Sequence, residues 1–393
     1  MVSGLRPLAT DVTTYWLSMH VPYVCRHSGA CCTSGWPIPV ERDRIAPLRV
    51  LRPDGQWLVR APDAPSEIGG ILASDRDGRC VFYGQAAGQR SSGNCEIHRQ
   101  IGHAALPSAC QHFPRECLID RRGVFVTLSH YCPTAASLLF RDTEPVRIVE
   151  GPQAIPSGQP EGLDAHDVLP PLLRPGLLMD HTAHGLWEAH IVRVLTTSDC
   201  APEAALNALD ADARSLSGWR WPDGALADAV LRLRSLIEPT AMLAPEWPRE
   251  QEDFATALGS LTTGTWAEYP ESAELIWPRR VATGWHEQRH VIKRWLAAHA
   301  FAAWMTYQGN GVLAQIARLH VALAVLRAES VRGCVVQNRD LDAQLLTHAI
   351  RQTDLLIVHL IDRAHLAARL SWATRQTLLR RGRGRWSRTR VAP

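Results

Sequence analysis

Cysteine is the residue type with the clearest chemical potential in this chain of 393 residues. Eight of its ten cysteines lie within residues 25–132. A chain of this length buries enough apolar surface to fold without disulfide bonds, and in a reducing cytosol a cysteine cluster indicates metal binding or catalysis first. Thiolates are soft ligands that bind zinc and the iron of iron–sulfur clusters. The sequence therefore predicts a thiolate metal site near the N-terminus.

The first cysteine motif begins at Cys25 and reads Cys-Arg-His-Ser-Gly-Ala-Cys-Cys. Its glycine lets the backbone curl, so that several sulfurs can converge. Two adjacent cysteines rarely close on a single ion, so we expect Cys31 and Cys32 either to face different metals or to supply one ligand between them. The later cysteines are widely spaced. The fold therefore has to bring their loops together, and a bound metal would contribute directly to the free energy of folding.

Four motifs follow one another along residues 31–133. They are Cys31-Cys32-Thr-Ser-Gly35-Trp36, Cys95-Glu-Ile-His98, Cys110-Gln-His-Phe113-Pro114-Arg115 and Leu128-Ser129-His-Tyr-Cys132-Pro133. Their order resembles the cysteine-cluster family of zinc- or iron-chelating proteins, and most closely its flagellin lysine-N-methylase branch. The likeness covers residues 20–140 with specific motifs and the remainder only in general character. Ser28 stands where the family has its second cysteine, and Cys117 lies outside the pattern.

The resemblance implies a metal centre that takes part in S-adenosylmethionine-dependent methylation of lysines on a protein substrate of the flagellin type. Both an iron–sulfur cluster and zinc accept four thiolates, so the choice of metal stays open. The alternative is a non-catalytic zinc- or iron-chelating protein whose metal is structural. The chain has no Gly-x-Gly-x-x-Gly loop to hold the cofactor. The implied metal ligands are Cys25, Cys31, Cys32, Cys80, Cys95, Cys110 and Cys132.

Three further side chains are candidates for the chemistry of methyl transfer. The guanidinium of Arg115 suits bidentate contact with the carboxylate of S-adenosylmethionine or of the substrate, or it pairs with a neighbouring acid. Methyl transfer requires a neutral lysine amine and hence a base or a desolvating pocket. Tyr131 and His130, which precede Cys132, are our candidates for that role.

Several histidines are weaker candidates for metal binding. His98 and His112 lie beside predicted ligands and either support them or are ordinary polar residues. His181, His184 and His190 share one predicted helix, but no carboxylate lies at ligand spacing. We therefore favour a solvated helix face for these three.

A loop-rich module has to position the cysteines. Residues 1–142 carry many turn signals and short runs typical of strands, at 38–40, 56–59 and 124–128. Residues 143–176 are rich in proline and predict a linker. Helical periodicity predicts an α-helical domain at 177–379 and a basic disordered tail at 380–393. The expected helices cover 181–196, 201–216, 225–237, 251–261, 288–307, 313–329, 341–361 and 365–379.

The predicted fold class is mainly α, with an irregular cysteine-rich metal-binding N-terminal module that contains short strands, followed by an α-helical domain. The chain has no apolar run of about 20 residues that could cross a membrane and no apolar signal-peptide core near its first residue. We therefore expect a cytoplasmic protein without a membrane partner. Seven arginines lie within residues 375–393, and we expect this tail to be solvated rather than bound to nucleic acid. Lys293 is the only lysine.

Overall fold

The computed structural model describes residues 12–84, 95–141, 144–153, 162–233, 273–307 and 311–361. The chain divides into two compact units. The first contains Met1–Arg141 and Ile148–Asp164, and the second contains Asp142–Arg147 and Ala165–Pro393. The predicted linker at 143–176 thus contributes to both units, and it contains short strands that its composition did not indicate.

A five-stranded mixed sheet forms the base of the first unit, in the order β7-β1-β6-β5-β8. The hairpin β5-β6 turns through two residues, and the carboxylate of Asp120 accepts a hydrogen bond from the backbone N–H of Arg122 at 2.8 Å. Such a side-chain bond to the next turn residue favours tight turns. The strands are β1 (Thr14–Leu17), β5 (Arg115–Asp120), β6 (Gly123–Leu128), β7 (Ile148–Glu150) and β8 (Gly162–Asp164).

The cysteine-rich part of the first unit has a small antiparallel sheet in the order β2-β4-β3. The predicted strands at 38–40, 56–59 and 124–128 are confirmed in β2, β3 and β6. Trp57 and Phe82 lie at the centre of its hydrophobic core, with rings 5.8 Å apart. The elements are β2 (Pro39–Glu41), β3 (Leu58–Val59), β4 (Ile68–Leu72), α1 (Arg42–Leu51), α2 (Glu96–Ile101), α3 (Ser108–His112) and α4 (Pro133–Leu138).

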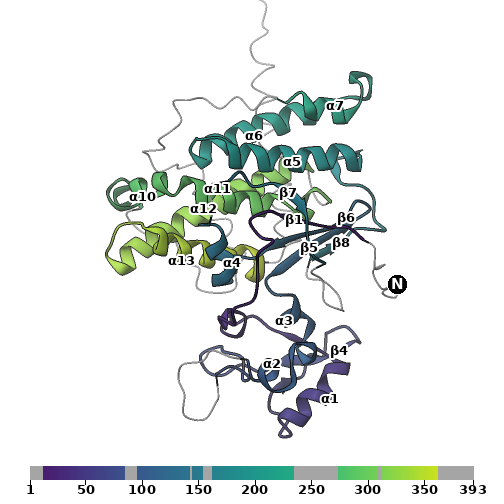
Figure 1. Cartoon of the computed structure of the whole chain (residues 1–393), viewed down its shortest axis with the longest axis vertical. Helices are drawn as coiled ribbons and strands as arrows, with labels where there is room; N and C mark the ends of the chain where they lie inside the picture. Colours follow the sequence, from purple (N-terminus) through teal and green to yellow (C-terminus); the bar gives the residue numbers. More distant parts are fainter. Residues whose placement is uncertain are drawn as a thin grey trace, which may run out of the picture. The chain divides into compact units, whose positions relative to one another are not determined.

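The described residues of the second unit are mainly α-helical and include one short hairpin, and helical structure predominates in the described chain, as predicted. The 26-residue helix α12 packs against α6, α11 and α13 (Figure 1). Most of its residues are buried, which is typical of a helix at the centre of a bundle. The elements are β9 (Leu172–Arg174), β10 (Leu177–Leu178), α5 (His181–Thr197), α6 (Pro202–Ser217), α7 (Leu226–Leu231), α9 (Ala273–Ile276), α10 (Ala282–Glu287), α11 (Arg289–Ala300), α12 (Val312–Gln337) and α13 (Ala343–Asp354).

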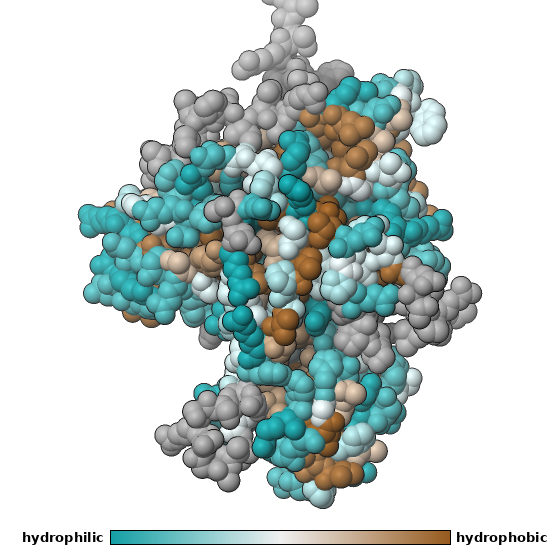
Figure 2. Space-filling view, in the orientation of Figure 1, coloured by the Kyte–Doolittle hydropathy of each residue, from teal (hydrophilic) through white to brown (hydrophobic). Residues whose placement is uncertain are grey.

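The expected helices at 181–196 and 201–216 are confirmed closely by α5 and α6. Those at 251–261 and 365–379, and the basic tail at 380–393, lie outside the described residues. Among the helices that the structure describes, none combines the length and the apolar character that crossing a membrane requires. The face of the molecule in Figure 2 is mostly hydrophilic, with small separate hydrophobic areas.

The single lysine of the chain lies on α11 and is buried. The Nζ of Lys293 donates a hydrogen bond to the backbone carbonyl of Ser198. Burial lowers the pKa of this ammonium group, while nearby Cys200 and Asp199 act in the opposite direction. Only 3% of the residue is exposed, so the one lysine amine of the protein is shielded from solvent.

Candidate metal centre

Five of the seven implied metal ligands gather around the core of the cysteine-rich part. Cys32 and Cys80 are buried within this core, and the other three pack against it. They come from four separate segments of the chain. The structure thus brings together thiols up to 79 residues apart in the sequence, as the wide spacing required. These five residues, which we call the thiol cluster, are Cys31, Cys32, Cys80, Cys95 and Cys110.

Backbone hydrogen bonds tie the segments of the thiol cluster to one another. The N–H of Cys80 donates to the carbonyl of Cys32 at 2.8 Å. Cys95 forms an isolated bridge with Tyr83 and then begins α2 as its N-cap residue. Farther along, the carboxylate of Glu41 accepts a hydrogen bond from the N–H of Ser108 at 3.2 Å, at the start of the helix that carries Cys110.

A tight turn at Gly29 positions the thiols of Cys31 and Cys32. Gly29 has φ = 74°, a left-handed conformation that favours glycine, and it precedes the single 3₁₀ turn Ala30–Cys32. The ring of Tyr83 covers the glycine so closely that a β-carbon there would lie 2.3 Å from the ring. Glycine therefore meets two demands at this position, the backbone turn and the close contact.

Hydrogen bonds among the thiols divide them into acidic and weakly acidic groups. The sulfurs of Cys31 and Cys32 lie 3.9 Å apart. Hydrogen bonding to Cys32 lowers the pKa of Cys31, and it lowers the pKa of Cys95 to about 7. The same two bonds, together with burial, raise the pKa of Cys32 far above its ordinary value. Cys31 and Cys95 are thus the members of the cluster that ionise most readily, whereas Cys32 stays neutral.

The other two members of the cluster are held in the neutral form. Burial raises the pKa of Cys80 to about 11. Burial, followed by the charges of Cys31, Cys80 and Cys95, raises the pKa of Cys110 well above its ordinary value. Each of the five thiols thus lies close enough to another member of the cluster to affect its pKa. A bound cation would reverse the effect, because it favours the thiolate form of every ligand.

Cys25 and Cys132, the remaining two implied ligands, lie near Tyr23. The hydroxyl of Tyr23 is 3.8 Å from the sulfur of Cys132. Burial raises the pKa of Tyr23 strongly, and the nearby thiols of Cys132 and Cys25 raise it further. The guanidinium of Arg115 lies over the same ring, 5.4 Å from its centroid. Tyr23, two residues before the first cysteine, is a member of this region that the sequence pattern did not single out.

Each candidate for the chemistry of methyl transfer has a definite place in the first unit. The Nε of Arg115 is buried and forms no hydrogen bond within the described residues. His130 is fully buried, and its Nε2 lies 3.2 Å from Nε2 of His20. Tyr131 is 5% exposed, with its ring 5.4 Å from that of Trp36. A lysine substrate would therefore need an opening to reach His130 or Tyr131.

The two histidines beside predicted ligands differ in their surroundings. His112 is completely buried, and neither ring nitrogen forms a hydrogen bond within the part of the chain that is described. Burial, with a contribution from Arg115, lowers its pKa to about 4, so the ring is neutral at pH 7. His98 instead lies between the rings of His27 and His103, at 4.6 and 5.6 Å.

The histidines of α5 do not form a solvated face, and that prediction is wrong for two of the three. His184 is completely buried near Glu188, with 3.8 Å between Nδ1 and Oε2. His190 is 7% exposed and lies 2.8 Å from the carboxylate of Asp212 on α6. Carboxylate partners make burial of these imidazoles acceptable. The histidines therefore stabilise the contacts of α5 rather than face the solvent.

The thiol cluster fits a thiolate-bound metal in donor type and burial, though not in the present orientation of its side chains. Within residues 12–84, 95–141 and the other described ranges, no three His, Cys, Asp or Glu side chains are arranged to hold a metal ion. Metal binding would thus require the cysteine side chains to rotate toward a common centre. No family model, curated protein or solved structure matches this chain.

Proposed function

We propose that the thiol cluster holds a metal, an iron–sulfur cluster in the first instance, and that the protein uses S-adenosylmethionine to methylate lysines of a flagellin-type protein substrate. The observation that supports the metal site is the gathering of five thiols from four segments around one core. The proposed reaction rests on the motif resemblance at residues 20–140.

The ligands would come first from the thiols that ionise most readily. Cys31 and Cys95 have lowered pKa values, and thiolates are the form that binds metal. The neutral thiols Cys32, Cys80 and Cys110 would lose their protons as the metal binds. When bound, the metal supplies positive charge that stabilises these thiolates. Cys25 and Cys132 lie with Tyr23, and we propose them as ligands of the same centre or of a neighbouring one.

Methyl transfer itself needs alignment and a proton acceptor. The lysine nitrogen attacks the methyl carbon, the carbon–sulfur bond breaks, S-adenosylhomocysteine leaves, and the ammonium proton passes to a base. We propose Arg115 as the group that holds the cofactor carboxylate, since its buried Nε–H has no acceptor among the described residues. His130 or Tyr131 would accept the proton, and His20 would be the next carrier after His130.

Metal analysis of protein purified without oxygen tests the first part of the proposal. We expect iron and acid-labile sulfide in the wild type, and a loss of most of both in Cys95→Ala and Cys110→Ala. Cys117→Ala is the matched control, because Cys117 is a buried cysteine of the same unit on β5. Colourless protein with stoichiometric zinc would support the alternative, a non-catalytic protein with a structural metal. Protein that binds neither metal would contradict both.

The second part of the proposal requires a separate assay. The reduced holoprotein is incubated with methyl-labelled S-adenosylmethionine and either purified flagellin or a lysate. We expect label on substrate lysines and at least a tenfold lower rate in Arg115→Ala, which corresponds to a loss of about 1.4 kcal/mol of transition-state binding or more. Label in no protein of the lysate would contradict methyl transfer while leaving the metal site intact.

A further inference from the structure

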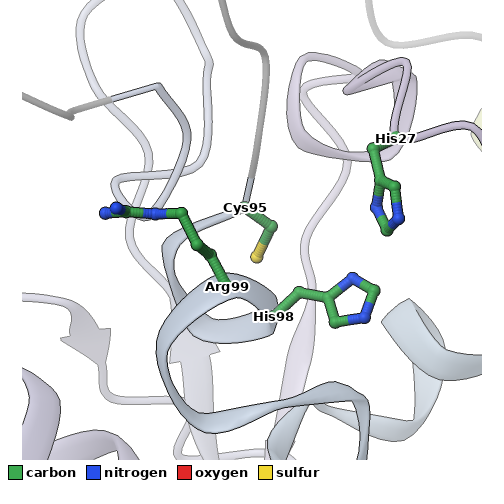
Figure 3. A pocket seen from close by; sticks show the side chains of 4 residues that line it. All are labelled: His27, Cys95, His98 and Arg99. Carbon is green, nitrogen blue, oxygen red and sulfur yellow. The ribbon is translucent and has the colours of Figure 1, made fainter.

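A pocket of about 250 Å³ lies beside the thiol cluster. Four residues line it: His27, Cys95, His98 and Arg99. In Figure 3 the imidazoles of His27 and His98 lie on one side of the Cys95 sulfur, and the side chain of Arg99 extends on the other side. Three of these four side chains therefore carry N–H groups, and none of the described residues in the lining has a carboxylate.

Two different segments build this pocket. His98 and Arg99 lie on α2, three and four residues after Cys95, so they follow that cysteine by one helical turn. His27 lies in the loop before Gly29 and has φ = 54°, which is unusual for a residue other than glycine. A left-handed conformation of this kind costs about 1 kcal/mol or more. The loop nevertheless holds the His27 ring 4.6 Å from that of His98.

No carboxylate of the described residues pairs with the guanidinium of Arg99. Glu96, the nearest acid in the sequence, forms a 2.6 Å ion pair with Arg52 and also accepts a hydrogen bond from Gln100. The side chain of Arg99 forms no ion pair or hydrogen bond within the described ranges of the chain. Its guanidinium is therefore available to a ligand. A guanidinium presents a planar set of donors that matches the oxygens of a carboxylate or phosphate.

We propose that this pocket binds a small anionic molecule, whose carboxylate or phosphate group is held by Arg99 on one side of Cys95 and whose remaining polar atoms are held by the imidazole N–H groups of His98 and His27 on the other side. The volume lies slightly below the range of about 300–1,000 Å³ that is usual for pockets of drug-sized ligands. It therefore suits a small anion or one end of a larger molecule. The proposal does not depend on methyl transfer, because it rests only on the lining, the charge and the size of the pocket.

Titration calorimetry of the full chain at low ionic strength tests this site with two probes, inorganic phosphate and succinate. We expect saturable binding of at least one probe, and the stronger of the two identifies the type of anion. Arg99→Ala and His98→Ala should each weaken binding at least tenfold. Arg49→Ala is the matched control, since Arg49 is an exposed arginine on α1 of the same unit, and it should bind the probe as the wild type does.

Three results would overturn the proposal. The first is that neither probe binds the wild type saturably. The second is that Arg99→Ala binds the probe as tightly as the wild type does. The third is that Arg49→Ala weakens binding as much as Arg99→Ala does. The last result would indicate general attraction to a basic surface. Arg99 is exposed, so its replacement leaves the core of the unit unchanged, and circular dichroism verifies that each variant is folded.

Discussion

Replacing Gly29 with alanine should loosen the thiol cluster more than the same replacement at Gly35. Both glycines have left-handed backbones, with φ of 74° and 77°. They differ in their surroundings, because a β-carbon at Gly35 would meet nothing within 4 Å. At Gly29 it would lie 2.3 Å from Cε2 and 2.6 Å from the hydroxyl oxygen of Tyr83. The pair of variants therefore isolates the contact with Tyr83.

Two contributions determine how much local stability Gly29→Ala loses. A left-handed alanine costs about 1–2 kcal/mol at either position. Non-bonded carbons normally lie about 3.5–4.0 Å apart, so at Gly29 the ring of Tyr83 would have to move by more than an ångström. Overpacking of this kind typically costs about 1–3 kcal/mol. Tyr83 pairs with Cys95 in a β-bridge, so the displacement of its ring should reach the thiol cluster. Gly29→Ala should therefore lower the free energy of local opening of the cluster by about 1–3 kcal/mol more than Gly35→Ala does.

Hydrogen exchange measured by mass spectrometry reports this local opening free energy directly. Each 1.4 kcal/mol changes the opening equilibrium about tenfold. In peptides that contain Cys80–Tyr83 or Cys95–Ile101, Gly29→Ala should therefore exchange about 5 to 150 times faster than Gly35→Ala. Adding Tyr83→Ala should remove most of the difference between the two glycine variants. Equal exchange in the two single variants would refute the argument that the Tyr83 contact orders the cluster.

Three further predictions concern the second unit. Trp187→Phe removes the N–H that donates a 2.8 Å hydrogen bond to the buried Oε1 of Gln315, so urea unfolding should show a free energy of unfolding that is lower by about 1–3 kcal/mol. The control is Trp221→Phe, at an 85% exposed position, which should lower it by less than about 0.5 kcal/mol. Burial raises the pKa of the Cys334 thiol to about 11 from 9.0. Its contribution to the free energy of unfolding is therefore full below pH 9 and is lost between pH 9 and 11, by up to about 3 kcal/mol. Cys334→Ala should reduce that alkaline loss of stability, and an unchanged dependence of stability on pH in this variant would contradict the prediction. Asp180→Ala removes the side-chain cap of α5, a 2.8 Å bond, and should cost about 1 kcal/mol in the same assay.

The helices of the second unit were the most predictable part of the fold, because apolar spacing alone identifies a long amphipathic helix. The end of α12 was harder to predict. We expected it at Glu329, but the helix continues to Gln337. Val331 and Cys334 extend its buried face, and left-handed Asn338 terminates it.

Two features could not be predicted because distant partners decide them. Strands β7 and β8 have three residues each, too few for a pattern, and they form because β1 and β5 offer free edges to pair with. The burial of His190 likewise depends on Asp212, which α6 supplies. In the candidate site, the motif order predicted seven ligands, but it appears only in three dimensions that five of them pack around one core whereas Cys25 and Cys132 lie near Tyr23.

The buried position of Lys293 has a practical consequence for all amine chemistry on this protein. Since no other lysine exists in the chain, reagents that acylate exposed amines should modify the folded protein only at its α-amino group. A methyl label found on lysine in a reaction mixture would likewise belong to another polypeptide, because the protein presents no accessible lysine to itself or to a second copy. Denaturation should expose one additional amine per chain, so acylation of Lys293 offers a residue-specific measure of unfolding in the second unit.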